Sequence, residues 1–229
     1  MDGLTAVVTG ASRGIGASVA RLFGAEGTHV VACARTLDEV ESVAESIRDH
    51  NGSATAVRAD VRDEHDLERL AAQAGADDTV DIVVANAAVN QGTPGDAPLH
   101  EESYSRFDDT LRTNVRGVFA TVRELAPHLA ADARVLVPSG SVAREAKPGM
   151  GAYAVSKASA EALVRGFAAD LDATAAAVDP GLVATDLSGG TGRDPDDIAP
   201  MFRWAAVEAD AAEIDGEVVD LRAWKQATR

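Results

Sequence analysis

Short apolar, β-branched segments alternate along the chain with longer segments whose apolar residues recur every three or four positions. The short segments predict buried strands and the longer ones predict amphipathic helices, because side chains repeat every two residues in a strand and every 3.6 in a helix. The expected strands are residues 4–9, 29–34, 54–57, 81–85, 134–137, 175–178 and 217–221. The expected helices are residues 15 to about 24, 37 to about 51, 63–74, 103–129, 151–171 and 200–208.

Regular alternation of strand and helix is typical of βαβ units. It predicts an α/β fold, a doubly wound parallel sheet of about seven strands with helices on both faces. The chain has no internal repeat, linker or shift in composition, so we expect residues 1–229 to form one domain. The polar, glycine-containing segment 187–200 is expected to be a mobile loop.

Charge and cysteine content exclude several classes of partner and site. The formal net charge is −16, and such a surface repels phosphate backbones and anionic lipid, so neither nucleic acid nor a membrane is an expected partner. The single cysteine, Cys33, excludes an intramolecular disulfide, and five scattered histidines give no metal-ligand spacing. Without a signal sequence or a long apolar run, a cytoplasmic protein is expected.

Basic residues are almost all arginine, since only Lys147, Lys157 and Lys225 are lysines. Scarce lysine with abundant aspartate and alanine resembles the composition of proteins from salt-loving microbes, and we expect a halophilic source. The alternative is an ordinary acidic protein from a GC-rich genome.

A glycine-rich segment, TGASRGIG at residues 9–16, follows the first strand and opens the first helix. Glycine permits positive φ and lets the backbone approach a pyrophosphate at a helix N-terminus. The spacing G-x-x-x-G-x-G differs from the G-x-G-x-x-G fingerprint, and a purely structural turn is the alternative. The segment predicts a dinucleotide site formed by Gly10, Ser12, Arg13, Gly14, Ile15 and Gly16.

The end of the second strand predicts which dinucleotide is preferred. An acidic residue there would bind the ribose 2′-hydroxyl of NAD, whereas arginine accommodates the 2′-phosphate of NADP. Ala34 occupies the acidic position, Arg35 follows it, and Arg13 lies in the glycine segment. NADP(H) is therefore expected in preference to NAD(H), although both arginines could be ordinary surface residues.

Tyr153 and Lys157 are four residues apart in the helix expected at 151–171, and therefore share one face. A nearby cation favours phenolate, so we expect Lys157 to lower the pKa of Tyr153 and make it a general acid or base near neutral pH. An unremarkable helical pair is the alternative.

Together, the TGxxxGxG segment, an asparagine in the helix expected at 103–129, a serine upstream of YxxxK and a Pro-Gly after the sixth strand resemble the short-chain dehydrogenase/reductase family. The resemblance covers essentially the whole chain and is to the compact, 3-oxoacyl-reductase-like branch. It implies a Rossmann-like fold and a homodimer or homotetramer. The last strand, however, continues into Asp220-Leu221-Arg222 where the family has Asp-Gly-Gly.

The resemblance also implies a catalytic set. Tyr153 would be the acid/base, Lys157 would also bind the nicotinamide ribose, and Asn114 would hold a water of the proton relay. Ser141 would hydrogen-bond the substrate carbonyl. Ser139 remains the alternative serine, because the spacing from Ser141 to Tyr153 is one residue shorter than expected.

The same resemblance extends the cofactor site beyond the glycine segment. Ala85 and Ala88 replace an asparagine and a glycine of the family's Asn-Asn-Ala-Gly motif. The implied cofactor-binding residues, besides Tyr153 and Lys157, are Arg35, Asp60, Val61, Asn86, Pro180, Gly181, Val183 and Thr185.

The expected function is reversible, NADP(H)-dependent reduction of a ketone or aldehyde to an alcohol, with a small carbonyl or alcohol compound as the substrate. An alcohol or sugar dehydrogenase working oxidatively is one alternative. A non-catalytic NADP-binding sensor is another.

Overall fold

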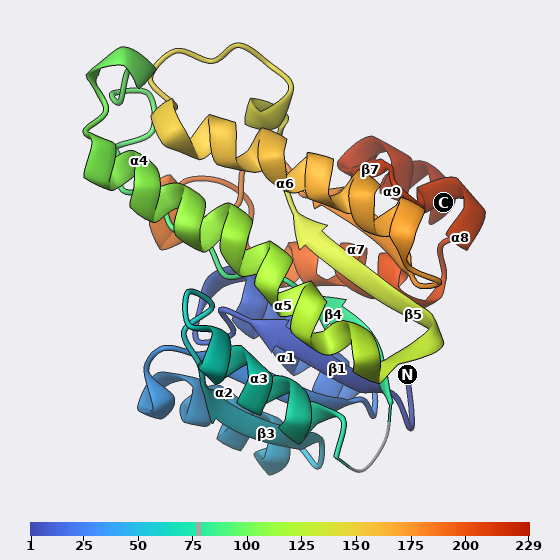
Figure 1. Cartoon of the computed structure of the whole chain (residues 1–229). Helices are drawn as coiled ribbons and strands as arrows, with labels where there is room; N and C mark the ends of the chain where they lie inside the picture. Colours follow the sequence, from blue (N-terminus) through green and yellow to red (C-terminus); the bar gives the residue numbers. More distant parts are fainter. Residues whose placement is uncertain (77–78) are drawn as a thin grey trace.

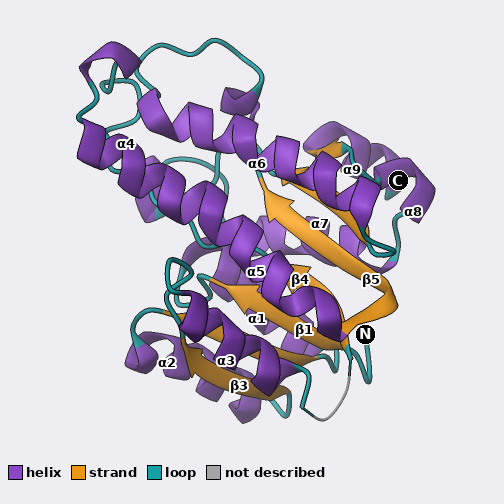
Figure 2. Cartoon of the chain, in the orientation of Figure 1, coloured by secondary structure: helices purple, strands orange, loops and turns teal. Residues whose placement is uncertain are grey.

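The computed structural model describes residues 1–76 and 79–229, and its seven strands form one parallel sheet (Figures 1 and 2). The strands lie in the order β3-β2-β1-β4-β5-β6-β7. Their bounds are β1 Thr5–Thr9, β2 His29–Ala34, β3 Ser53–Arg58, β4 Val80–Val84, β5 Leu129–Pro138, β6 Thr174–Asp179 and β7 Val218–Asp220. The predicted doubly wound parallel sheet is confirmed.

The centre of the sheet is the pair β1 and β4, joined in parallel register with Val8 opposite Val84. All five residues of β1 are buried, as expected for a parallel strand covered on both faces. The chain winds outward from β1 to β3 and then returns to β4 on the other side of β1, so the strand order reverses there. In such sheets, ligands bind in the crevice at the carboxyl ends of the strands where the order reverses.

Helices cover both faces of the sheet. Three of them, α1, α2 and α7, pack on one face, while α3, α5 and α6 pack on the other. The bounds are α1 Gly14–Ala25, α2 Leu37–Asp49, α3 Glu64–Ala74, α4 Tyr104–Leu111, α5 Gly117–Leu125, α6 Gly151–Asp170, α7 Pro195–Val207, α8 Ala211–Ile214 and α9 Leu221–Ala227. None of the helices in the described part of the chain is both long and apolar enough to cross a membrane.

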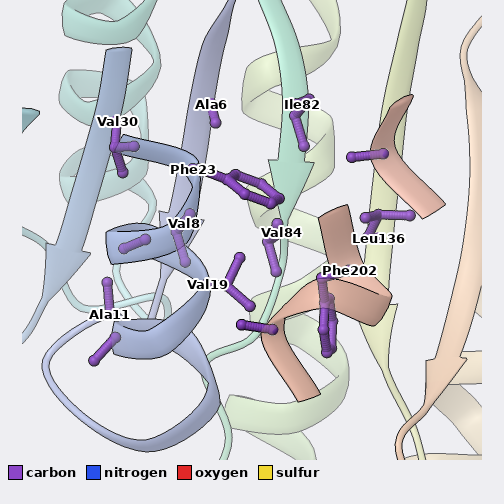
Figure 3. Close-up of a cluster of buried hydrophobic side chains, with 14 of the residues drawn as sticks. Ala6, Val8, Ala11, Val19, Phe23, Val30, Ile82, Val84, Leu136 and Phe202 are labelled. Carbon is purple, nitrogen blue, oxygen red and sulfur yellow. The ribbon is translucent and has the colours of Figure 1, made fainter. Parts of the chain in front are cut away.

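Neighbouring residues of one strand contribute to different cores because their side chains point to opposite faces. In β1, Val8 packs in the core beneath α1, α2 and α7, whereas Val7 packs in the core beneath α3, α5 and α6. Figure 3 shows the first core, where Phe23 of α1 and Phe202 of α7 lie over the central strands. This packing holds the N-terminus of α1 against the carboxyl end of β1.

The helix expected at 103–129 is present but interrupted. It consists of α4, a π-helical turn over Arg112–Arg116, α5 and a short 3-10 turn over Ala126–His128. Single π-helical turns inside α-helices are frequent at functional sites. This one contains Asn114, which the resemblance placed in the catalytic set.

The structure corrects three of the expected boundaries. Strand β5 begins at Leu129, five residues earlier than predicted, with a register shift against β4. Helix α7 begins at Pro195, since the Asp194 carboxylate accepts the Asp196 N–H and proline is tolerated in the first turn. The prediction of one loop over 187–200 is therefore wrong. The last strand is followed by α9, which the pattern did not predict.

Candidate active site

Two adjoining cavities lie at the carboxyl ends of the strands. The first, about 460 Å³, extends along the glycine segment and the ends of β2 and β3. The second, about 400 Å³, lies between the end of β5, the start of α6 and the segment after β6. The residues that line both are Ile15, Asn86, Ala88, Thr185 and Leu187. The cavities therefore form one crevice with two parts, which we call the cofactor cavity and the substrate cavity.

Backbone conformation shapes the cofactor cavity. Gly10 and Gly14 have φ of +64° and +56°, a region that side chains rarely adopt. A Cβ on Gly10 would lie 2.8 Å from the Ala87 Cα, and one on Gly16 would lie 2.4 Å from the Gly10 carbonyl oxygen. These three positions therefore require glycine. Gly16 lines neither cavity, and it is needed because it lies against the Gly10 carbonyl in the turn.

Side chains from β1 and the end of β4 fix this turn. The Asn86 amide nitrogen donates to the carbonyl oxygens of Thr9 and Gly10 at 2.9 and 3.1 Å. The Thr9 hydroxyl accepts the backbone N–H of Ala87 at 3.1 Å. No side chain caps the N-terminus of α1, whose first residue follows Arg13. Uncapped N–H groups beside a glycine cradle fit a pyrophosphate, so the residues present fit a dinucleotide.

The far end of the cofactor cavity contains charges of both signs. Arg13 is 60% exposed and pairs with Asp186 at 2.8 Å and Glu39 at 3.6 Å. Arg35 lines the same cavity and forms no ion pair with any described residue. Both arginines predicted for a 2′-phosphate therefore lie at this cavity, one of them already partnered.

Asp60, which the resemblance placed beside the adenine, also lines this cavity. The Arg62 guanidinium donates to both of its carboxylate oxygens, at 2.7 to 3.1 Å. This hydrogen bonding lowers the pKa of Asp60, so the carboxylate is ionised at neutral pH. Val61 follows it on the cavity wall.

The substrate cavity brings together Ser141, Tyr153 and Lys157. Helix α6 supplies the tyrosine and the lysine one turn apart, and the Lys157 ammonium lies over the phenol ring, 5.6 Å from its centroid. The ammonium donates to the Pro138 carbonyl oxygen at the end of β5, at 2.9 Å. The end of β5, the 3-10 turn after it and the first turns of α6 thus bring residues from one stretch of the chain, 138–157, to one wall of the cavity.

The structure reverses the direction expected for the pKa of Tyr153. Burial raises it to about 12, because the phenolate would lose its hydration, and the Asp179 carboxylate raises it further. Burial lowers the pKa of Lys157 to about 8, with Glu161 and Asp179 opposing the shift. The predicted depression by Lys157 is therefore not found, because the loss of hydration on burial dominates the shift.

The two candidate serines have different partners. The Ser139 hydroxyl is buried and donates to Glu161 Oε1 at 2.6 Å. Ser141 begins a short 3-10 turn, and its Oγ accepts the Lys147 ammonium at 2.5 Å. Lys147 and Ser141 in turn lower the pKa of Glu145 by hydrogen bonding. Both serines line the substrate cavity, and Ser139 is the more buried of the two, with its proton donated to Glu161.

Asn114 does not line either cavity, and its side chain is only 2% exposed. Its Oδ1 accepts the Val89 N–H at 2.8 Å, and its Nδ2 donates to the Val89 carbonyl and to Ser156 Oγ, both at 2.9 Å. The Ser156 hydroxyl donates to the Tyr153 carbonyl at 2.7 Å. The amide therefore fixes the cavity wall at Val89 and the first turn of α6.

A buried charge cluster behind the substrate cavity was not predicted. The Arg144 guanidinium donates to both Glu161 and Asp179, whose side chains are each 6% exposed. Asp179 also accepts the Gly181 N–H at 3.0 Å. The spacing offered a signal for Glu161, which is four residues after Lys157 on the same helix face, but nothing local connects Arg144 to it.

Most residues predicted for the site do line it. Gly16 and Asn114 are the two exceptions, and both support its walls. In the segment after β6, Gly181 has φ of +70° and Thr185 faces Gly14 across the cavity, its methyl 3.1 Å from where a Gly14 Cβ would lie. No group of His, Cys, Asp and Glu able to hold a metal ion occurs among residues 1–76 and 79–229.

Comparisons with known proteins agree with this geometry. Residues 4–196 match the family model described as short chain dehydrogenase. Versicolorin reductase stcU of Emericella nidulans is 33% identical over 193 residues, covering 82% of this chain and 72% of that protein. Glycine betaine reductase ATRR of the same fungus is 33% identical over 195 residues, but this chain spans only 15% of it.

Solved structures show the same likeness over nearly the full length. A 3-ketoacyl-ACP reductase from Sinorhizobium meliloti 1021 superposes with a TM-score of 0.85 at 29% identity. The superposition covers 95% of this chain and 96% of that chain.

Proposed function

The chain belongs to the short-chain dehydrogenase family, and from this we propose that it is an NADP(H)-dependent enzyme that reversibly reduces a ketone or aldehyde to an alcohol. One observation carries the proposal. Ser141, Tyr153 and Lys157 line a single cavity that adjoins the glycine-lined cofactor cavity. The family assignment makes the chain an oxidoreductase, and its members bind NAD or NADP.

The cofactor would occupy the crevice from the glycine turn to the substrate cavity. The turn at Gly10–Gly14 and the N-terminus of α1 would hold the pyrophosphate, Asp60 and Val61 the adenine, and Lys157 the ribose nearest the substrate. The segment from Pro180 to Thr185 would position the nicotinamide. When bound, NADPH supplies the hydride that adds to the carbonyl carbon.

Tyr153 donates the proton that the carbonyl oxygen takes up. With a pKa of about 12, its hydroxyl is protonated at neutral pH, so it stands ready as a proton donor. Ser141 hydrogen-bonds the same oxygen and orients it.

Lys157 and Asn114 complete the proposed set. Lys157, with a pKa of about 8, is mostly protonated at neutral pH and can return a proton to Tyr153. Asn114 positions Val89 and Ser156, and through Ser156 the first turn of α6. The resemblance implies that Asn114 also holds the water of the proton relay.

Preference for NADP(H) over NAD(H) is supported by Ala34, Arg35 and Arg13. Ala34 leaves the end of β2 without the carboxylate that binds a ribose 2′-hydroxyl, and Arg35 forms no ion pair or hydrogen bond with a carboxylate of the described residues, acting on Asp60 only through its charge. We expect a lower KM for NADPH than for NADH, and a rise of about tenfold in the NADPH KM alone for Arg35→Ala. A wide kinetic preference for NADH would contradict this part of the proposal.

The experiment that tests the function follows NADPH absorbance with a panel of small ketones, aldehydes and alcohols. Reduction of carbonyl compounds supports the proposal. Turnover confined to alcohols or sugars with NADP⁺ would point to an oxidative dehydrogenase. Tight NADPH binding without turnover of any compound would point to a cofactor sensor.

Four further properties are proposed on the resemblance and composition. We propose that residues 1–229 form one domain, that the protein is cytoplasmic, and that it assembles as a homodimer or homotetramer, which light scattering tests. A halophilic source is supported by the net charge of −16. Unfolding followed in increasing KCl tests it, since no stabilisation between dilute buffer and molar salt would contradict adaptation to brine.

A further inference from the structure

Lysine is concentrated in the substrate cavity. The chain has three lysines, and two of them, Lys147 and Lys157, line this cavity. No aspartate or glutamate of the described residues lines it, although the chain contains 37 of these residues. The wall that a substrate meets is therefore cationic within a strongly acidic protein.

The two lysines are not equivalent. Lys157 is buried, bonds to Pro138, and has Glu161 and Asp179 close enough to act on its pKa. The Lys147 side chain is 44% exposed and reaches Ser141 from the 3-10 turn side of the cavity. Lys147 is therefore the ammonium that an entering ligand can reach.

The Lys147 ammonium retains a donor for a ligand. An ammonium has three N–H donors. Within the part of the chain that the structure describes, its partners are Ser141 Oγ and Glu145 Oε2, the latter at 3.1 Å. Glu145 lies outside the cavity lining, so it balances the charge without blocking the cavity.

From this arrangement, and resting on the reductase function proposed above, we propose that the substrate is a small oxo acid whose carboxylate binds Lys147. Its carbonyl oxygen then lies at Ser141 and Tyr153. The carboxylate would accept a charge-assisted hydrogen bond from the Lys147 ammonium.

Distances restrict the class further. The anchoring atoms, Lys147 Nζ and Ser141 Oγ, are 2.5 Å apart. With hydrogen bonds of about 2.8 Å to each, the carboxylate and carbonyl oxygens lie no more than about 8 Å apart. A 2-oxo or 3-oxo acid meets this limit, as does an acid whose oxo group is one or two carbons further away, and the limit excludes only acids with a distant oxo group. The remaining wall is largely apolar and accepts the hydrocarbon part of the substrate, at Val142, Met150, Leu182, Val183 and Leu187.

The test compares 3-oxobutanoate with its neutral amide, 3-oxobutanamide, as substrates of the NADPH-loaded enzyme. The variants are Lys147→Met, Lys147→Arg and, as the matched control, Lys225→Met in the C-terminal helix α9. We expect Lys147→Met to lower kcat/KM for the acid by about tenfold or more and to change it for the amide by less than about twofold. Lys147→Arg should restore part of the loss, and Lys225→Met should behave as the parent.

If Lys147 only orients Ser141, Lys147→Met would lower kcat/KM equally for the acid and the amide, and that result overturns the proposal. Equal kcat/KM of the parent enzyme for the acid and the amide also overturns the proposal, while leaving the reductase function intact. Calorimetric binding of 3-oxobutanoate to the NADP⁺-loaded protein separates the two proposals. Binding that depends on Lys147 without turnover of any carbonyl compound would refute the function and keep the carboxylate site. Absence of both binding and turnover would refute both.

Discussion

The two cavities of the crevice are built by different means. The cofactor cavity is shaped mainly by backbone, with three glycines of one eight-residue segment setting the turn and Asn86 holding it. The substrate cavity is shaped by side chains from β5, α6 and the segment after β6, supported by charges buried behind it. The cofactor cavity therefore tolerates few substitutions at its glycines, whereas single substitutions in the substrate cavity can change which ligand it binds.

The largest effect is expected from Tyr153→Phe, which removes one hydroxyl from the substrate cavity. Removing the proton donor should lower kcat for carbonyl reduction by about 10² to 10⁴-fold. NADPH affinity, measured by fluorescence titration, should stay within a few-fold because the glycine turn is untouched. Near-normal turnover would show that another group donates the proton.

Gly16→Ala tests the backbone of the cofactor cavity. Its Cβ would lie 2.4 Å from the Gly10 carbonyl oxygen, so the turn must shift. We expect a loss of about 1–3 kcal/mol in the free energy of unfolding and a large loss of NADPH affinity.

The matched control is Gly166→Ala on α6, where an added Cβ meets nothing within 4 Å. There the same substitution should stabilise the helix by about 0.5–1 kcal/mol. Normal NADPH binding by Gly16→Ala would break the comparison, because the cofactor cavity would not depend on that backbone contact.

Arg144→Met tests the charges behind the substrate cavity. It leaves the buried Glu161 and Asp179 carboxylates without their shared cation. Losing one partner of a fully buried pair costs about 3–5 kcal/mol, and we expect about 2 kcal/mol because the guanidinium is partly exposed. Urea unfolding measures this, with Arg165→Met on the exposed side of α6 as control. Equal effects of the two variants would contradict a structural role for the cluster.

The smallest effect is a pH dependence from Lys157. Its pKa is about 8 in the folded protein, below the usual 10.5 of lysine, so between these values the unfolded chain binds more protons. Stability should therefore rise with pH in this window through Lys157, and Lys157→Met should lack that rise.

Tyr153 acts in the opposite sense above pH 10. Its pKa is raised to about 12, so the folded state keeps a proton that the unfolded chain has lost, and stability falls towards pH 12.

The rise in stability attributed to Lys157 is tested by the unfolding free energies of the parent and of Lys157→Met from pH 7.5 to 10. A constant difference across that range would contradict the lowered pKa of Lys157.

The sequence by itself determined the seven strands, the doubly wound order of elements, the glycine turn and the pairing of Tyr153 with Lys157 on one helix face. Each of these depends on residues that are neighbours in the chain, where period and spacing act directly. Only the tertiary structure decided the start of α7, the partners of Asn114 and of the two serines, and the joining of Arg144 to Glu161 and Asp179. It also decided the direction of the Tyr153 pKa shift, because burial and distant carboxylates act through space and leave no pattern in the order of residues.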